Sequence, residues 1–185
     1  MSVSLDGFVG GPNGEKDWVF KSSDPESLAW SVEAIREAGL IIMGRNTFES
    51  ISSYWPTATG PFAAPMNEIP KAVFTQKGFK VVPGASSSPA AISWAQTRVF
   101  DGDLAEEIRQ LKQEPGKPII AIGGAGFMRS LIATGLIDEY YLAIHPVILG
   151  AGQPVFNGFV KPLDLKLVAT KVFPGGIIGY TYQPA

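Results

Sequence analysis

The chain of 185 residues is long enough to bury one hydrophobic core without the support of disulfides or metals. Its 15 basic and 17 acidic side chains give a formal net charge of -2 and form no basic cluster, which argues against nucleic acid as a partner. The absence of cysteine excludes disulfides and thiolate chemistry, and a single histidine leaves little for a metal site. We therefore expect one domain over residues 1–185, without a bound metal.

No segment of the chain resembles a membrane span or a secretion signal. The longest apolar runs are far shorter than the roughly 18 residues that a spanning helix requires. The first residues also lack the basic region and the apolar block of a signal peptide. We expect a cytoplasmic protein with no membrane partner.

Segments with helical periodicity alternate with short apolar runs through most of the chain. A first helix is expected after Asp24, where Pro25 takes the first helical position and Gly39 ends it. Another is expected after Asp103, with Glu106 completing a capping box. The apolar runs have the length of strands and lie at residues 40–43, 72–75, 118–122 and 140–144. This alternation predicts an α/β fold with a mainly parallel sheet and helices on both faces.

The last part of the chain has a different pattern. Residues 163–173 and 177–182 flank a Pro-Gly-Gly turn with no helical segment between them, which predicts an antiparallel hairpin at one edge of the sheet. The segments 54–66 and 83–93 are rich in Pro, Ala and Ser or Thr, and we interpret both as surface loops.

Two places combine a strand end, glycine and a helix start. Residues 40–43 lead into Gly44-Arg45-Asn46-Thr47, and residues 119–122 lead into Gly123-Gly124-Ala125-Gly126. Glycine allows the backbone to approach a ligand closely, and the N–H groups of a helix start attract anions. Either junction alone is explained by a turn or a tight packing contact. Together, at the carboxyl edge of one parallel sheet, they predict a site for an extended diphosphate ligand.

Three other polar residues stand near expected strand ends or in irregular segments. Asp6 follows Ser4-Leu5, where it would cap a turn or contact a ligand. Asp17 precedes Trp18 in a segment without clear periodicity, and it would be either solvated or an acid beside a dry apolar wall. His145 ends an apolar strand as a hydrogen-bonded structural residue or as an acid-base group.

Residues 42–51 and 122–127 closely resemble the two nucleotide-binding signatures of the dihydrofolate reductase fold. The similarity covers nearly the whole chain. Residues 4–8 and 145–150 look most like the group related to the C-terminal reductase domain of the bifunctional riboflavin-biosynthesis deaminase-reductase. This resemblance implies a three-layer α/β fold with a mixed, mostly parallel sheet and a C-terminal antiparallel hairpin.

The resemblance further implies NADPH as the cofactor and hydride transfer to a C=N or C=O carbon of a small heterocycle. The implied cofactor-binding residues are Gly44, Arg45, Thr47, Thr75, Gln76, Gly123, Gly124, Ala125, Gly126 and Phe127, with Lys77 near the ribose phosphate. The expected catalytic residues are Asp17, directly or through a bound water, and His145 as the alternative proton donor. The expected substrate-binding residues are Asp6, Trp18, Ser27, Ser50 and Ile51.

Two structural expectations follow from the same resemblance. The Gly123–Gly124 peptide is expected to be cis, as in dihydrofolate reductases. The chain is expected to form a homodimer, because the strand at 140–144 and the C-terminal hairpin offer edges for a second copy.

The chain departs from dihydrofolate reductases at two positions. Ser27 stands where the substrate-binding carboxylate precedes Leu-Ala-Trp, and Glu26 points about 100 degrees away around the helix. Pro70 stands where an arginine would hold the glutamate tail of folate. A pyrimidine reductase of the riboflavin type is therefore the preferred function. The alternatives are a dihydrofolate reductase in the strict sense and a nucleotide-binding module without catalysis.

Overall fold

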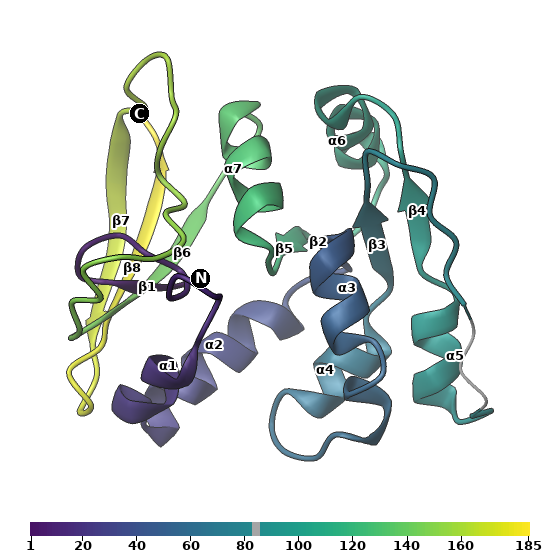
Figure 1. Ribbon diagram of the computed structural model, residues 1–185, viewed down its shortest axis with the longest axis horizontal. Coiled ribbons are helices and arrows are strands. Elements are labelled where there is room, and N and C mark those ends of the chain that lie inside the picture. The colour runs from purple at the N-terminus through teal and green to yellow at the C-terminus, as the bar shows by residue number, and fades with distance from the viewer. Residues whose placement is uncertain (83–85) are drawn as a thin grey trace. The chain divides into compact units, whose positions relative to one another are not determined.

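The computed structural model describes residues 1–82 and 86–185 and divides them into two compact units (Figure 1). The terminal unit comprises Met1–Trp30 and Arg129–Ala185, and the central unit comprises Ser31–Met128. Each unit contains one four-stranded sheet.

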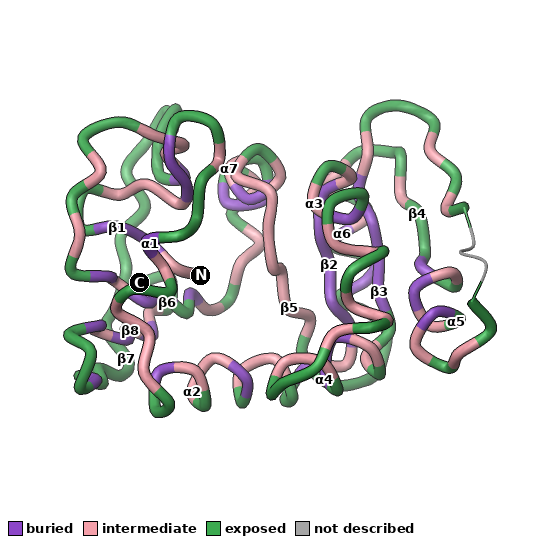
Figure 2. The backbone as a smooth tube through the Cα atoms, turned by 60° about the horizontal axis from the view of Figure 1, so that its bottom comes forward, coloured by how far each residue is buried: buried purple, intermediate pink, exposed green. Residues whose placement is uncertain are grey.

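The central unit holds a parallel sheet in the order β4-β3-β2-β5. Its elements are β2 (Leu40–Gly44), α3 (Arg45–Ile51), the 3-10 helix η1 (Trp55–Thr57), α4 (Ala63–Glu68), β3 (Lys71–Phe74), α5 (Pro89–Ala95), β4 (Arg98–Phe100), α6 (Leu104–Gln113) and β5 (Ile119–Ala121). Every residue of β2 and β3 is buried, as expected of parallel strands covered on both faces (Figure 2). The core around them is formed by Ile41, Met43, Phe48, Met66, Val73 and Trp94.

The terminal unit holds a mixed sheet in the order β1-β6-β8-β7. Its strands and its first helix are β1 (Ser2–Ser4), α1 (Asp17–Ser22), β6 (Tyr140–His145), β7 (Leu165–Val172) and β8 (Ile178–Pro184). Strand β1 is parallel to β6, and the pairs β6–β8 and β7–β8 are antiparallel. Helix α2 (Pro25–Arg36) begins in this unit and ends in the central unit, and α7 (Ala125–Ala133) does the reverse.

The two capped helices begin where the sequence predicts. Asp24 Oδ1 accepts hydrogen bonds from the backbone N–H groups at the start of α2, and Asp103 Oδ1 accepts one from Glu106 N at 2.9 Å. The return contact of the second cap comes from a different residue than expected, since Gly102 N donates to Glu107 Oε1 at 2.9 Å. Both helices therefore have satisfied N-termini.

Three segments that were interpreted as irregular contain helices. Residues 54–66 include η1 and the start of α4, and Asp17 and Trp18 begin α1. Of the segment 83–93, residues 83–85 lie outside the described residues, and the rest includes the start of α5. Proline misled the interpretation because the first turn of a helix tolerates it, as at the start of α5, where Ser88 supplies the cap.

The predicted α/β fold class and the C-terminal hairpin are confirmed, and the strands are distributed over one parallel and one mixed sheet. The expectation that the strand at 140–144 forms an edge is wrong, because β6 lies between β1 and β8. None of the helices in the described ranges is both long and apolar enough to cross a membrane.

Candidate functional site

The first glycine junction lies where β2 meets α3. Gly44 ends the strand, and a Cβ atom at this position would lie 2.8 Å from Cβ of Phe127. The Gly44 N–H also donates to the carbonyl oxygen of Gly123 at 3.4 Å. Glycine is thus required at position 44 by the approach of α7, and the two glycine junctions are adjacent in space, at the carboxyl edge of the parallel pair β2 and β5.

The second junction turns the chain from β5 into α7. Gly123 and Gly124 have φ angles of 151° and 78°, which only glycine adopts readily. The expected cis peptide is wrong, because the described residues contain no cis peptide bond. Two consecutive glycines with positive φ make this turn with trans bonds.

The Thr47 side chain packs against this turn. A Cβ atom at Gly124 would lie 3.0 Å from Thr47 Oγ1, and a Cβ atom at Gly123 would lie 3.4 Å from Thr47 Cγ2. The threonine hydroxyl therefore faces the bare backbone of the double glycine. Neither α3 nor α7 has an acidic residue in its first turn, so no carboxylate competes for the amides of these helix starts.

Two aromatic contacts hold the start of α7 against the sheet. The Phe127 ring stacks on Phe74 with 5.3 Å between ring centroids, and Phe74 stacks on Phe100 at 5.1 Å. Phe74 and Phe100 lie at the ends of β3 and β4. The stack fixes the position of the glycine turn relative to the carboxyl edge of the sheet.

Arg45 is the first residue of α3 and is only partly exposed. Its Nε donates to Glu49 Oε1 at 2.9 Å, and its guanidinium lies 5.0 Å from the centroid of the Phe79 ring. Both contacts restrict the side chain near the glycine junction. The bond to Glu49 uses Nε, so an anion would have to be bound by the terminal nitrogens of the guanidinium.

Residues 75–77 follow β3 at the same carboxyl edge. The Thr75 hydroxyl donates to the Lys77 carbonyl oxygen at 2.7 Å and accepts from the Lys77 N–H at 3.2 Å. Thr75 therefore shapes a tight turn, and it exposes the side chains of Gln76 and Lys77. Of the residues expected near a ribose phosphate, Gln76 and Lys77 have the accessible donors.

In the terminal unit, Asp6 holds the loop that follows β6. Its carboxylate accepts hydrogen bonds from Ser4 Oγ at 2.7 Å, from Leu149 N at 3.1 Å and from Gly150 N at 2.8 Å. The Ser4 hydroxyl contributes most to lowering the pKa of Asp6, and the two backbone amides lower it further. In this structure Asp6 has the role of a loop cap.

Asp17 and Trp18 are adjacent in sequence but point in different directions. Asp17 is exposed at the first position of α1, whereas Trp18 is 7% exposed. The Trp18 ring packs edge-on against His145, with 5.2 Å between centroids. The expected dry wall therefore faces His145 and not Asp17, because consecutive residues of a helix differ by about 100 degrees.

His145 is 1% exposed at the end of β6. Its Nδ1 lies 2.8 Å from Ser22 Oγ, and its Nε2 is buried without a hydrogen-bond partner among the described residues. Burial lowers the pKa of His145 from 6.5 to about 4. The imidazole is therefore neutral at physiological pH, which suits the structural alternative better than proton donation.

The other expected substrate-binding residues have structural contacts. Ser27 is buried, and its hydroxyl donates to the Asp24 carbonyl oxygen at 2.9 Å. Ser50 donates to the Asn46 carbonyl oxygen at 2.7 Å, and Ile51 packs against the central core. Ser27 belongs to the terminal unit, and Ser50 and Ile51 belong to the central unit.

Sequence reasoning missed one polar cluster in the central unit. Lys71 begins β3 and is 2% exposed, with its Nζ donating to Asn67 O at 3.0 Å and Ser93 Oγ at 2.6 Å. The same ammonium lies 4.8 Å from the centroid of the Trp94 ring. Burial lowers the pKa of Lys71 to about 8. The only signal in the sequence is a charged residue at the start of an apolar strand.

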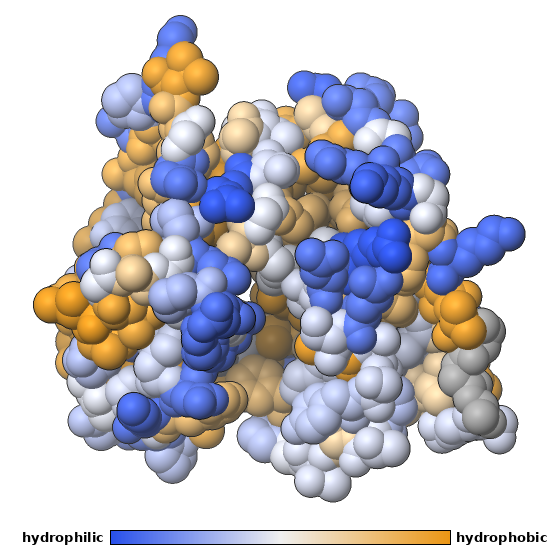
Figure 3. All heavy atoms as spheres, viewed as in Figure 1, coloured by the Kyte–Doolittle hydropathy of each residue, from blue (hydrophilic) through white to orange (hydrophobic). Residues whose placement is uncertain are grey.

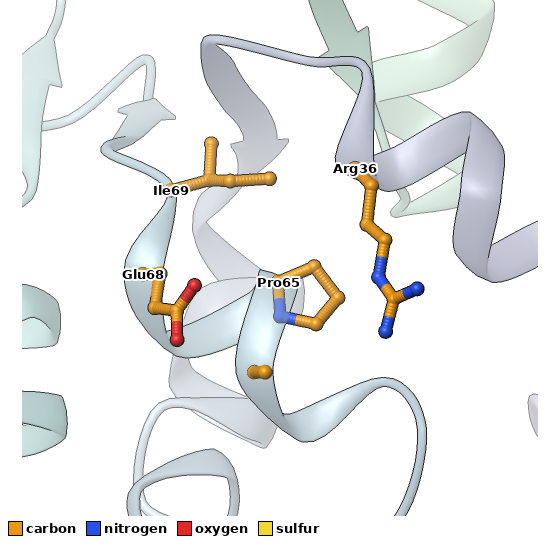
Figure 4. A pocket seen from close by; sticks show the side chains of 5 residues that line it. Arg36, Pro65, Glu68 and Ile69 are labelled. Carbon is orange, nitrogen blue, oxygen red and sulfur yellow. The ribbon is translucent and has the colours of Figure 1, made fainter.

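A shallow pocket of about 250 Å³ lies elsewhere in the central unit, and its lining residues are Arg36, Ala64, Pro65, Glu68 and Ile69 (Figure 4). Helices α2 and α4 end here, just before β2 and β3 begin. The pocket is therefore at the amino edge of the sheet, opposite to the edge that carries the glycine junctions.

Comparison with known proteins identifies the family and several relatives of this chain. The family described as the RibD C-terminal domain matches residues 1–178. Two proteins of Bacillus subtilis (strain 168) are similar to this chain. YyaP is 32% identical over 183 residues, which are 99% of this chain and 92% of YyaP. YwjB is 26% identical over 173 residues, which are 94% of this chain and 89% of YwjB.

Solved structures share the fold. A protein of Shewanella sp. PV-4 assigned to riboflavin biosynthesis matches 100% of this chain and 96% of its own, with a TM-score of 0.79 and 22% identity. The diaminohydroxyphosphoribosylaminopyrimidine deaminase/5-amino-6-(5-phosphoribosylamino)uracil reductase of Thermotoga maritima matches 100% of this chain and 55% of its own, with a TM-score of 0.64 and 18% identity. The superfamily resemblance inferred from the sequence is thereby confirmed.

Proposed function

Because the chain belongs to the RibD C-terminal domain family, we propose that it is an NADPH-dependent reductase of a small heterocycle, of the pyrimidine-reductase type found in riboflavin biosynthesis. The observation that carries this proposal is the pair of glycine junctions. The Gly44 N–H reaches the Gly123 carbonyl, and Thr47 closes the turn at Gly124. The known activity of the Thermotoga maritima relative adds the substrate class.

The central unit has the groups that would hold the diphosphate of such a cofactor. The first backbone N–H groups of a helix have no acceptor within the helix, so those at the start of α7, next to the double glycine, are available to an anion. The Thr47 hydroxyl and the Arg45 guanidinium add a donor and a positive charge. Glycine at position 124 lets the Thr47 hydroxyl approach the backbone of this turn, because a Cβ here would lie 3.0 Å from Thr47 Oγ1.

Exposed groups after β3 would meet the adenosine end. Lys77 and Gln76 are exposed beyond the turn that Thr75 shapes. A ribose phosphate attracts an ammonium and an amide, whereas a free ribose hydroxyl gains less from a positive charge. We therefore assign NADPH, rather than NADH, as the preferred cofactor.

Bound NADPH would supply a hydride to an electrophilic carbon of the substrate. The residues of the chain have to deliver a proton to the neighbouring heteroatom. His145 does not suit this role, because it is neutral and fully buried with its pKa lowered to about 4. Asp17 is exposed at the start of α1, without the apolar wall that a direct donor would need, so we propose that it orients the water that delivers the proton.

The strict dihydrofolate reductase function has less support. The Ser27 hydroxyl is bound to the Asp24 backbone and cannot replace a carboxylate. Pro70 has no side-chain donor for a glutamate tail. We keep catalysis on a smaller ring system as the preferred function.

Two measurements test the proposal. Fluorescence titration should show tight NADPH binding by the wild type. Arg45→Ala should bind NADPH at least tenfold more weakly, which corresponds to a loss of about 1.5 to 3 kcal/mol of binding free energy. Glu49→Ala is the matched control, because it breaks the Arg45 ion pair and keeps the guanidinium. If both variants bind as the wild type does, Arg45 has no role at the cofactor.

NADPH oxidation with a panel of aminopyrimidines and pterins tests the reaction itself. Turnover of an aminopyrimidine with loss of activity in Asp17→Asn would support the proposal. Tight NADPH binding without turnover of any compound would favour a nucleotide-binding module. Absence of NADPH binding would contradict both functions.

A further inference from the structure

A buried lysine and a serine hydroxyl are in direct contact in the central unit. The Nζ atom of Lys71 lies 2.6 Å from Ser93 Oγ, and Lys71 is 2% exposed. Ser93 lies in α5 and is only partly buried, so it is the accessible member of the pair. Lys71 is the first residue of β3 and therefore lies at the amino edge of the parallel sheet, opposite to the edge that carries the glycine junctions. The reductase function proposed above uses neither residue.

The surroundings of Lys71 fix the position of its amine. Nζ also donates to the Asn67 carbonyl oxygen at 3.0 Å, and it lies 4.8 Å from the centroid of the Trp94 ring. Asn67 is held in turn, because its Oδ1 accepts from Trp94 Nε1 at 2.8 Å and its Nδ2 donates to the Trp55 carbonyl oxygen at 2.8 Å. The amine is thus held beside the Ser93 hydroxyl before any reagent arrives.

Burial makes this lysine a base at moderately alkaline pH. It lowers the pKa of Lys71 from 10.5 to about 8. The titratable residues of the elements around Lys71 are Arg45 and Glu49 in α3, Glu68 in α4 and Arg98 in β4, and β2, α5 and η1 have none. Desolvation alone causes the shift, so none of these charges contributes to it. About a tenth of the chains carry a neutral Lys71 amine at pH 7, and about nine tenths do at pH 9.

The hydrogen bond between the two side chains reverses its direction when Lys71 loses its proton. The charged ammonium donates to Ser93 Oγ. A neutral amine has a lone pair, so it accepts from the Ser93 hydroxyl and still donates to the Asn67 carbonyl oxygen. A serine hydroxyl that donates to a neutral amine is an activated nucleophile, as in enzymes that pair serine with lysine.

We propose that Ser93 is a nucleophile activated by Lys71 and is acylated by activated esters of short carboxylic acids. The Ser93 Oγ atom attacks the carbonyl carbon of the ester and forms a new bond to it. The bond between this carbon and the leaving alcohol oxygen breaks, and the alcohol leaves as its anion. The hydroxyl proton passes to Lys71 Nζ, which later releases it to water. The product is an ester on Ser93.

The surface near Ser93 suits a small neutral reagent. Helix α5 contains no charged residue, and in the region of α5 Figure 3 shows mainly pale and orange side chains. Ser93 is only partly exposed, so a short acyl group reaches it more easily than a long one.

Reaction of the whole chain with p-nitrophenyl acetate at several pH values, followed by mass spectrometry that locates the acetyl groups, tests this proposal. Ser93 should be acetylated at least about 100-fold faster than Ser50, which is more exposed but donates its hydroxyl to the Asn46 carbonyl oxygen. The rate at Ser93 should rise with pH and become constant above about pH 8, where the amine is neutral. Equal rates at the two serines, or a rate that keeps rising up to pH 10, would overturn the proposal.

Two variants remove the base in different ways. Lys71→Met has no amine, and Lys71→Arg keeps a positive charge that cannot be deprotonated in this pH range. Each should lower the rate at Ser93 by about 100-fold or more. Lys80→Met is the matched control, because it removes an exposed ammonium and should leave the rate unchanged. A rate at Ser93 that stays the same in folded Lys71→Met or Lys71→Arg would overturn the proposal.

The position of the acetyl group distinguishes the hydroxyl from the amine as the nucleophile. Ser93→Ala should lose the acetyl group on α5, and it should bind NADPH as the wild type does, because the glycine junctions lie at the opposite edge of the sheet. Acetylation of Lys71 in place of Ser93 would overturn the proposal. Circular dichroism shows whether each variant is folded. If the Lys71 variants do not fold, the pH profile of the wild type and the site of its acetyl group still decide.

Discussion

Ser22 Oγ lies 2.8 Å from His145 Nδ1, and this contact ties the end of α1 to the end of β6 in the terminal unit. The other imidazole nitrogen is buried without a partner in the described part of the chain. Protonation of His145 is unfavourable at neutral pH, because burial lowers its pKa to about 4.

The burial of His145 predicts that the protein loses stability in acid. The unfolded chain takes up a proton on His145 near pH 6.5, and the folded chain does so only near pH 4. The free energy of unfolding should therefore fall as the pH drops below about 6.5, by up to about 3 kcal/mol at pH 4. Urea unfolding at several pH values measures the fall. His145→Gln should lack it, whereas Ser22→Ala should keep it and lose about 1 kcal/mol at neutral pH.

Lys71 predicts a rise in stability on the alkaline side. The pKa of Lys71 is about 8 in the folded protein and 10.5 for an exposed lysine, so the unfolded chain binds this proton more strongly. The free energy of unfolding should rise with pH between about 8 and 10.5. Lys71→Met should abolish this rise. At pH 7 it should raise the free energy of unfolding by about 1 kcal/mol, reduced by the contribution of the lost hydrogen bonds to Asn67 and Ser93. Lys77→Met, an exposed control, should keep the rise; a flat profile in the wild type would contradict the prediction.

Gly124→Ala should impair the cofactor more than the fold. The substitution puts a Cβ 3.0 Å from Thr47 Oγ1 at a φ angle of 78°. The strain should cost about 1 to 3 kcal/mol of stability, and the added Cβ atom should weaken NADPH binding by at least about tenfold. Thermal unfolding and fluorescence titration measure the two effects separately. Equal loss of binding and of folded protein would indicate a structural role alone.

Cofactor choice should depend on Lys77. We expect NADPH to bind more tightly than NADH. Lys77→Gln should lower the ratio of the NADPH affinity to the NADH affinity by about tenfold, since it removes one charge-assisted contact. Binding of NADH should change little in this variant. Titration of both nucleotides with both proteins measures the difference. Equal affinities in the wild type would contradict the assignment of NADPH.

Dihydrofolate should be a poor substrate. Ser27 lacks the carboxylate that would pair with the protonated pterin, and Pro70 lacks the guanidinium that would pair with the glutamate tail. Loss of one partner of a buried charged pair costs about 2 to 5 kcal/mol, so the two losses should reduce folate binding by several powers of ten. Steady-state NADPH oxidation with dihydrofolate checks this. A kcat/KM of about 10⁴ M⁻¹s⁻¹ or higher would establish the strict dihydrofolate reductase function instead.

The features that depend on neighbouring residues could be predicted from the sequence. Apolar runs identified the buried strands, and Asp24 and Asp103 identified the starts of α2 and α6. Glycine at the end of β2 and glycine after β5 identified the two junctions. Each of these is a local preference of a short segment, so it can be recognised without knowledge of the packing. The same local logic failed where proline lies in the first turn of a helix, as in α5.

The contacts between groups that are far apart in the sequence became known only from the three-dimensional structure. It placed Trp18 and Ser22 against His145, made β6 an internal strand and left β7 as the free edge. It also placed Thr47 against Gly124 and buried the ammonium of Lys71 beside Ser93. Burial and hydrogen bonding set the pKa values and accessibility of these side chains, and both depend on residues distant in sequence, so no local pattern encodes them.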